Sequence, residues 1–117
     1  MGFKNFLEKL QSFLDTGYLD IPGKECQVPD PVQRIVLACS LFERESYKNL
    51  GNVSSRQYSF FSQIFTATLT SISPEVFAQS ASSLDSKSKD FILRGIEYSS
   101  QEFPLLDLSC YSRSLSF

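Results

Sequence analysis

The first apolar pattern of the chain lies at its start. Between residues 2 and 16 the apolar residues are three or one positions apart, which places them on one side of a helix: Phe3, Phe6, Leu7, Leu10, Phe13 and Leu14. Gly17 follows, and glycine commonly ends a helix in the left-handed conformation. We therefore expect an amphipathic helix over residues 1–16. It either packs on its own domain or is detachable, so that it docks in a partner's groove or on a membrane surface.

Two longer segments are expected at the centre of the fold. Asp30 followed by Pro31 predicts the start of a helix, because the carboxylate caps a free amide and proline fits the first helical position. This helix should cover about residues 30–49 and is apolar nearly all round its axis. A second helix should cover residues 57–72, within a stretch from Gln57 to Pro74 that contains no charged residue. A solvated helix normally carries Lys and Glu, so we expect both sides of this one to be covered.

Two shorter helices are expected in the second half of the chain. Ser73 and Pro74 predict one that runs to about residue 82 and is anchored by Val76 and Phe77. Asp85 should open another that ends near residue 101. Small residues interrupt the apolar side of this last helix at three positions, which predicts that a neighbouring helix approaches closely there: Ser88, Gly95 and Ser99.

Two segments lack a helical pattern. Residues 18–30 contain Pro22, Gly23 and Pro29, which predict a loop. The end of the chain, residues 105–117, is rich in serine. The predicted fold is therefore all-α: a compact bundle of four to five helices in one domain, residues 1–104, followed by an irregular Ser-rich C-terminal tail.

Composition excludes several kinds of chemistry. The 117 residues include 11 Lys and Arg, 13 Asp and Glu, and no His, which gives a net charge of −2. Without His there is no Ser–His or Cys–His nucleophile pair and no imidazole metal ligand. The basic residues are scattered, so we expect no nucleic-acid partner. No stretch reaches the roughly 20 apolar residues that cross a bilayer.

The remaining candidates for catalysis do not form a convergent set. Glu43 and Glu45 are the best carboxylates, with Tyr47 or Cys39 nearby, yet residues two apart on a helix point about 200° apart. The three cysteines contain no CxxC pair, so no metal site is expected. Their odd number and the absence of a signal-peptide pattern predict a cytoplasmic location. We expect neither an enzyme nor a bound cofactor.

The aromatic content favours a binding function. Eleven Phe and five Tyr make up 14% of the chain, and a small domain can hide only some of them. Exposed rings are strong interface anchors. We therefore expect a small non-catalytic protein–protein interaction module, such as an adaptor, a secretion or assembly chaperone, or an inhibitor. It would bury its uncharged helical face against another protein or, by self-association, in a homodimer. The expected partner-binding residues are Phe3, Phe6, Leu10, Phe60, Phe61 and Ile64.

Two alternatives stay open. The first is a peripheral membrane-surface protein that binds through the amphipathic helix at residues 3–14, although its polar side has no net basic charge. The second is a small helix-turn-helix-like regulator that places residues 57–72 in a DNA groove. That segment offers Gln, Ser and Thr, with Arg56 as the nearby cation for phosphate.

Overall fold

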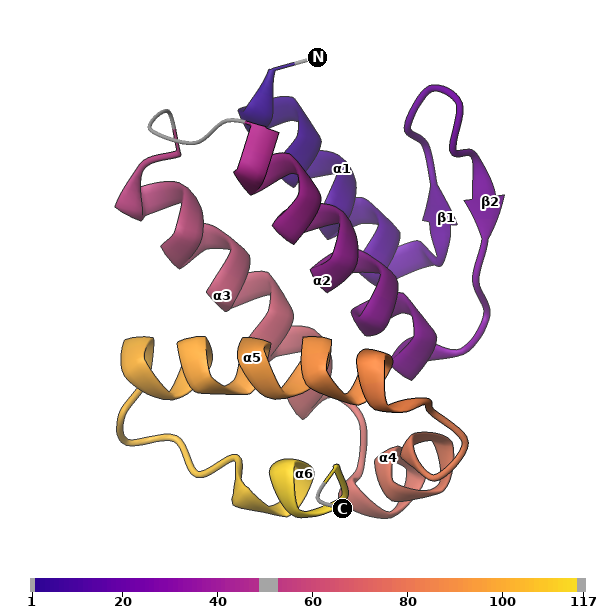
Figure 1. Ribbon diagram of the computed structural model, residues 1–117, viewed down its shortest axis with the longest axis vertical. Coiled ribbons are helices and arrows are strands. Elements are labelled where there is room, and N and C mark those ends of the chain that lie inside the picture. The colour runs from indigo at the N-terminus through magenta and orange to yellow at the C-terminus, as the bar shows by residue number, and fades with distance from the viewer. Residues whose placement is uncertain (1, 49–52, 116–117) are drawn as a thin grey trace.

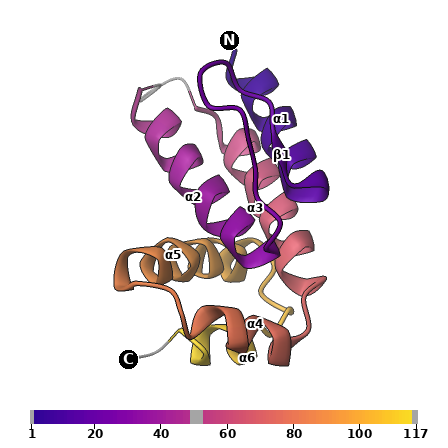
Figure 2. The same cartoon turned by 90° about the vertical axis from the view of Figure 1, so that its right-hand side faces the viewer.

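Three long helices lie side by side and a fourth crosses their ends (Figure 1). The computed structural model describes residues 2–48 and 53–115 of the chain, and the described residues form an all-α fold. The elements in chain order are α1 (Phe3–Thr16), β1 (Tyr18–Leu19), β2 (Cys26–Gln27), α2 (Pro31–Lys48), α3 (Ser55–Thr70), α4 (Pro74–Ala81), α5 (Ser86–Glu102) and α6 (Ser109–Arg113). Helix α5 packs across α2 and α3, and α4 and α6 lie together on its other side, as Figure 2 also shows.

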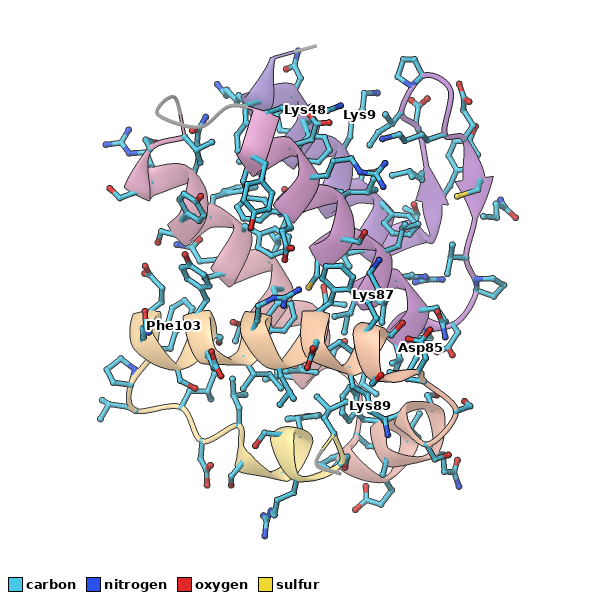
Figure 3. The ribbon with its side chains drawn as sticks, viewed as in Figure 1. Lys9, Lys48, Asp85, Lys87, Lys89 and Phe103 are labelled. Carbon is cyan, nitrogen blue, oxygen red and sulfur yellow. The ribbon has the colours of Figure 1, made fainter. Side chains whose placement is uncertain are left out.

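Most helix ends follow from the capping residues in the sequence. The Ser54 hydroxyl accepts a hydrogen bond from the backbone amide of Gln57, whose side chain in turn accepts one from the Ser54 amide. Ser73 caps α4 in the same manner. Asp85, at the start of α5 in Figure 3, accepts a hydrogen bond from the Ser88 amide, and this bond lowers the pKa of the carboxyl group. Gly17 ends α1 with a φ of 82°, as predicted.

Helix α1 is an integral part of the hydrophobic core. Its apolar side packs against α2 and α3, and five of its side chains are buried: Phe6, Leu7, Leu10, Phe13 and Leu14. Each buried side chain of this size contributes about 1.5–3 kcal/mol relative to its exposed state. Detachment of α1 would therefore expose a large part of the core to water.

The close approach predicted for the fifth helix is confirmed. Gly95 of α5 lies directly against the ring of Phe65 on α3, where a Cβ atom would be only 2.6 Å from two ring carbons. One turn further on, the hydroxyls of Ser99 and Thr66 share a buried hydrogen bond. Small and hydroxyl-bearing residues thus allow α3 and α5 to pack closely, and among the described residues every buried side-chain nitrogen and oxygen has a hydrogen-bond partner.

Residues 18–30 are more regular than the predicted loop. They form a two-stranded antiparallel hairpin in which Tyr18 pairs with Gln27 and Leu19 with Cys26. Arg34 of α2 fixes the end of this hairpin, because its guanidinium donates hydrogen bonds to the carbonyls of Val28 and Pro29. The prolines and glycine limit the strands to two residues each but do not prevent the pairing.

The irregular tail predicted for residues 105–117 contains one short helix. Residues 109–113 form α6, which makes the described helices six in number, where the sequence predicted four to five. The Tyr111 hydroxyl donates a hydrogen bond of 2.7 Å to the carbonyl of Ile72, and the Tyr111 ring meets the ring of Phe77 edge-on. Leu108 and Leu115 are buried on either side. Their helical spacing, which the Ser-rich composition obscured, makes the tail part of the core.

Candidate functional site

Helix α3 lines a hollow on each of its two sides. The first hollow, which we call the aromatic pocket, lies between α2, α3 and α5 and has a volume of about 310 Å³. Seven aromatic side chains contribute to its walls: Phe42, Tyr47, Tyr58, Phe61, Phe65, Phe91 and Tyr98. The second, which we call the neutral groove, lies between α1, α3, α4 and the start of α2 and has a volume of about 690 Å³. Its α3 residues are Phe60, Gln63, Ile64, Ala67 and Thr68, and Ser71 follows at the end of the helix.

The rings of the aromatic pocket hold one another in place. The Phe42 and Phe61 rings stack with centroids 4.0 Å apart and planes 8° from parallel. The Tyr58 and Tyr98 rings stack at 5.8 Å. The edge of Tyr58 also meets Phe42, at 5.4 Å. Because the rings come from three helices and contact one another, the walls of the pocket are preorganised.

The charges at the pocket neutralise each other. Glu43 of α2 and Arg94 of α5 form an ion pair of 3.0 Å that joins two of the pocket walls. The Arg94 guanidinium also lies over the Phe91 ring, 5.0 Å from its centroid. Both side chains of the ion pair are partly exposed, so the pair lies where the pocket meets solvent.

Cys39 lines the pocket as a neutral thiol. Its side chain is buried, and burial raises its pKa to about 12, with a further contribution from the Glu43 carboxylate that the Arg94 cation partly opposes. A thiolate nucleophile needs a depressed pKa. Cys39 is therefore a small apolar wall residue.

The structure separates the residues that the sequence offered for catalysis. Glu43, Tyr47 and Cys39 all line the pocket. Glu45 is not among the lining residues and contacts Lys48 at 3.5 Å instead. The pocket thus holds one carboxylate that is already paired with Arg94 and one thiol that stays protonated. General acid–base catalysis requires a free base and covalent catalysis requires an activated nucleophile, and neither the Glu43 carboxylate nor the Cys39 thiol is one of these.

The neutral groove differs in its chemistry. Its apolar floor includes Leu14, Ile64 and Ile72, while Gln63 and Ala67 of α3 are exposed along it. The charged lining residues are Asp15 and Arg34, of which Arg34 already donates to the hairpin carbonyls. Apart from the Asp15 carboxylate and the Arg34 guanidinium, the groove presents apolar, amide and hydroxyl surface to solvent.

The structure places most of the predicted partner-binding residues in the core. Phe6, Leu10, Phe61 and Ile64 are at most 7% exposed, whereas Phe3 and Phe60 are partly exposed. Phe61 lines the aromatic pocket, and Phe60 and Ile64 line the neutral groove. The three residues of α1 line neither hollow. In the folded chain, buried rings are not available as interface anchors, because burial already satisfies their apolar surface.

The apolar side chains that are most exposed at the two hollows are not among the predicted partner-binding residues. Tyr47 and Tyr98 at the aromatic pocket are 72% and 51% exposed. Val76, which lines the neutral groove, is 52% exposed, so its prediction as an anchor of α4 is wrong. Phe77 and Ala81 are both fully buried and lie one helical turn apart. That spacing marks the buried side of α4 and places Val76 off it.

Comparison of the chain with models of protein families, with curated protein sequences and with solved structures finds no match. Within residues 2–48 and 53–115, no helix is both long and apolar enough to cross a membrane. The same residues contain no group of three or more Cys, Asp or Glu side chains that is placed to hold a metal ion.

Proposed function

We propose that this protein is a non-catalytic binding module whose neutral groove receives an apolar or amphipathic segment of another protein. One observation carries the proposal: none of the α3 residues that line the groove is charged, although water reaches two of them, Gln63 and Ala67. On the covered side of α3, a charge would be desolvated, so folding alone excludes it. At Gln63 and Ala67 the side chains are exposed, and folding does not exclude Lys or Glu there. An apolar partner would exclude them.

The shape of the groove favours a foreign segment over a second copy of the same surface. A symmetric dimer places the same patch of both copies face to face. Two concave grooves in that arrangement leave a space between them, whereas a helix or an extended strand from another protein fills one groove. Recognition of a helix in a groove depends on apolar anchors at helical spacing, and the floor of this groove offers apolar contacts along α3 and α4.

The two other functions have less support. Binding to a membrane surface through residues 3–14 would use side chains that α1 buries against α2 and α3. DNA binding through α3 would use a helix that packs against α1, α2 and α5 and has Arg56 as its basic residue. The protein-binding proposal needs no rearrangement of the core.

The test compares two exposed alanines. Ala67 lies in the neutral groove, and Ala78 is exposed on α4 and is not among the groove residues. Ala67→Glu places a charge in the groove, and Ala78→Glu is the matched control. The wild-type protein, A67E and A78E are each used to capture proteins from cells that express the chain naturally. We expect a partner that wild type and A78E both retain and that A67E loses by at least about tenfold, the effect of an unpaired charge in an apolar interface.

Three outcomes would contradict the proposal. The first is that A67E retains every protein that A78E retains, although both variants keep the wild-type amide spectrum. The second is that light scattering finds a dimer that A67E dissociates, because the groove would then bind a second copy of the chain. The third is that both variants lose the partner, because its binding site would then lie outside the groove.

A further inference from the structure

The aromatic pocket has the size of a small-molecule site. Ligand pockets in proteins begin at about 300 Å³, and an apolar cavity of about 150 Å³ is enough to bind benzene. At about 310 Å³, the aromatic pocket is about twice that size and corresponds to a ligand of two fused rings. The pocket lies on the opposite side of α3 from the neutral groove, so this inference does not depend on the proposed function.

Close packing of the surrounding helices maintains this pocket. Gly95 allows the Phe65 ring to lie on the backbone of α5, and the stacked pairs fix the rings on either side. The rings cannot collapse into the space without giving up these contacts. A preorganised apolar pocket binds a ligand without an ordering cost to the protein.

The charges around the pocket select a neutral ligand. The Glu43 carboxylate and the Arg94 guanidinium already satisfy each other, and Arg94 also lies over the Phe91 ring. An anionic ligand would have to separate Arg94 from Glu43, and a cationic ligand would have to separate Glu43 from Arg94. A neutral ligand leaves the ion pair intact.

We propose that the aromatic pocket binds a neutral aromatic small molecule of about two fused rings, held by ring contacts with the partly exposed side chains of Tyr58, Phe91 and Tyr98. The occupant is a free small molecule and not a side chain of a protein partner. The Glu43–Arg94 ion pair joins α2 to α5 at the solvent side of the pocket, and the backbone of a docked protein would cover and desolvate it. A free ligand of this size would leave the ion pair exposed to water.

The test uses indole as the probe, with indole-3-acetate and tryptamine as its anionic and cationic analogues. Because the chain contains no tryptophan, indole fluorescence excited at wavelengths beyond the absorption of its five tyrosines reports on the ligand alone. We expect indole to bind one site with a Kd below about 1 mM, and the two charged analogues to bind at least about tenfold more weakly. In an amide spectrum, the shifts on indole binding should be largest at the pocket, including Gly95.

Two serines of α2 provide a blocked pocket and its control. Ser46 lines the pocket and Ser40 does not, and both are half-buried. Ser46→Leu should weaken indole binding by at least about tenfold, and Ser40→Leu should bind as wild type does. Tyr98→Ala removes a half-exposed wall and provides a second test if S46L fails to fold. It should weaken binding by at least about threefold.

Four results would overturn the proposal. The first is no saturable indole binding up to millimolar concentration. The second is equal affinity for indole and its charged analogues. The third is wild-type affinity in S46L or, where that variant does not fold, in Y98A. A peptide with a tryptophan side chain that binds this pocket more tightly than indole does would assign the site to a protein partner and would also contradict the proposal.

Discussion

The α3 residues that line the two hollows lack charge for different physical reasons. On the side toward α5, Ser62 and Thr66 are buried, and Thr66 bonds to Ser99 across the interface. On the side toward α1 and α4, Gln63 and Ala67 remain exposed. An uncharged helical segment therefore does not by itself mean that its own domain covers it. The covered side is explained by folding, and the exposed side is left for a partner to explain.

The largest difference in stability is expected when one ring is removed from each side of α3. Phe65 is 1% exposed at the aromatic pocket, and Phe60 is half-buried at the neutral groove. Phe65→Ala should lower the free energy of unfolding by about 3–5 kcal/mol, whereas Phe60→Ala should lower it by about 1 kcal/mol or less. Urea unfolding of both variants measures the difference. Equal losses would mean that both sides of α3 are core, and the comparison would fail.

The second test concerns the hydroxyl groups of α3. Thr66→Val leaves the buried Ser99 hydroxyl without its partner and should cost about 1–3 kcal/mol. Thr70→Val changes an exposed position one turn away and should cost less than about 0.5 kcal/mol. The double variant T66V/S99A should recover part of the T66V loss, because both partners of the bond are then absent. Additive effects in this cycle would show that the two hydroxyls are not coupled.

Five of the six described helices were predictable from the sequence because each of these five has a local signal. Asp30 with Pro31, Ser54 and Asp85 cap helices where the structure begins them, and Gly95 lies at the predicted close approach. Asn49, the predicted last residue of the helix over residues 30–49, lies outside the described residues. These signals depend on neighbours in the sequence and on hydrogen bonds within one helix turn. The helices could therefore be predicted without knowledge of the tertiary structure.

The tail and the hollows depend on contacts between distant residues. Tyr111 bonds to Ile72, 39 residues away, and nothing in the Ser-rich tail indicates that contact. The predicted partner-binding set failed to separate buried from exposed rings for the same reason. Phe60 and Phe61 are adjacent in the sequence, yet one lines the neutral groove and the other the aromatic pocket. Only the positions of α1 and α5 around α3 decide which ring is buried.

The stability of the protein at high pH should report on the burial of Cys39 at the aromatic pocket. Cys39 has an ordinary pKa of 9.0 in the unfolded chain and a pKa of about 12 when folded. Between these values the unfolded thiol ionises and the folded thiol keeps its proton, so stability falls as pH rises, by up to about 1.4 kcal/mol per unit. Cys39→Ala should remove this slope, while Cys26→Ala on the exposed hairpin should keep it. Parallel stability curves for wild type and C39A above pH 9 would contradict the burial of Cys39.

The smallest effect on stability is expected from the ion pair of the aromatic pocket. Glu43→Gln should change the free energy of unfolding by less than about 1 kcal/mol, because both charges are partly exposed. It should nevertheless leave Arg94 free to pair with a ligand carboxylate, and so raise the affinity for indole-3-acetate about three- to tenfold. Glu45→Gln is the control, since Glu45 lies on the same helix, contacts Lys48 and is not a lining residue. Unchanged affinity for indole-3-acetate in E43Q, with indole still bound, would show that the ion pair does not select the charge of the ligand. A gain in affinity for indole-3-acetate in E43Q and not in E45Q would show that the aromatic pocket selects against an anionic ligand because Arg94 is paired with Glu43. The described residues that line the neutral groove contain no such ion pair.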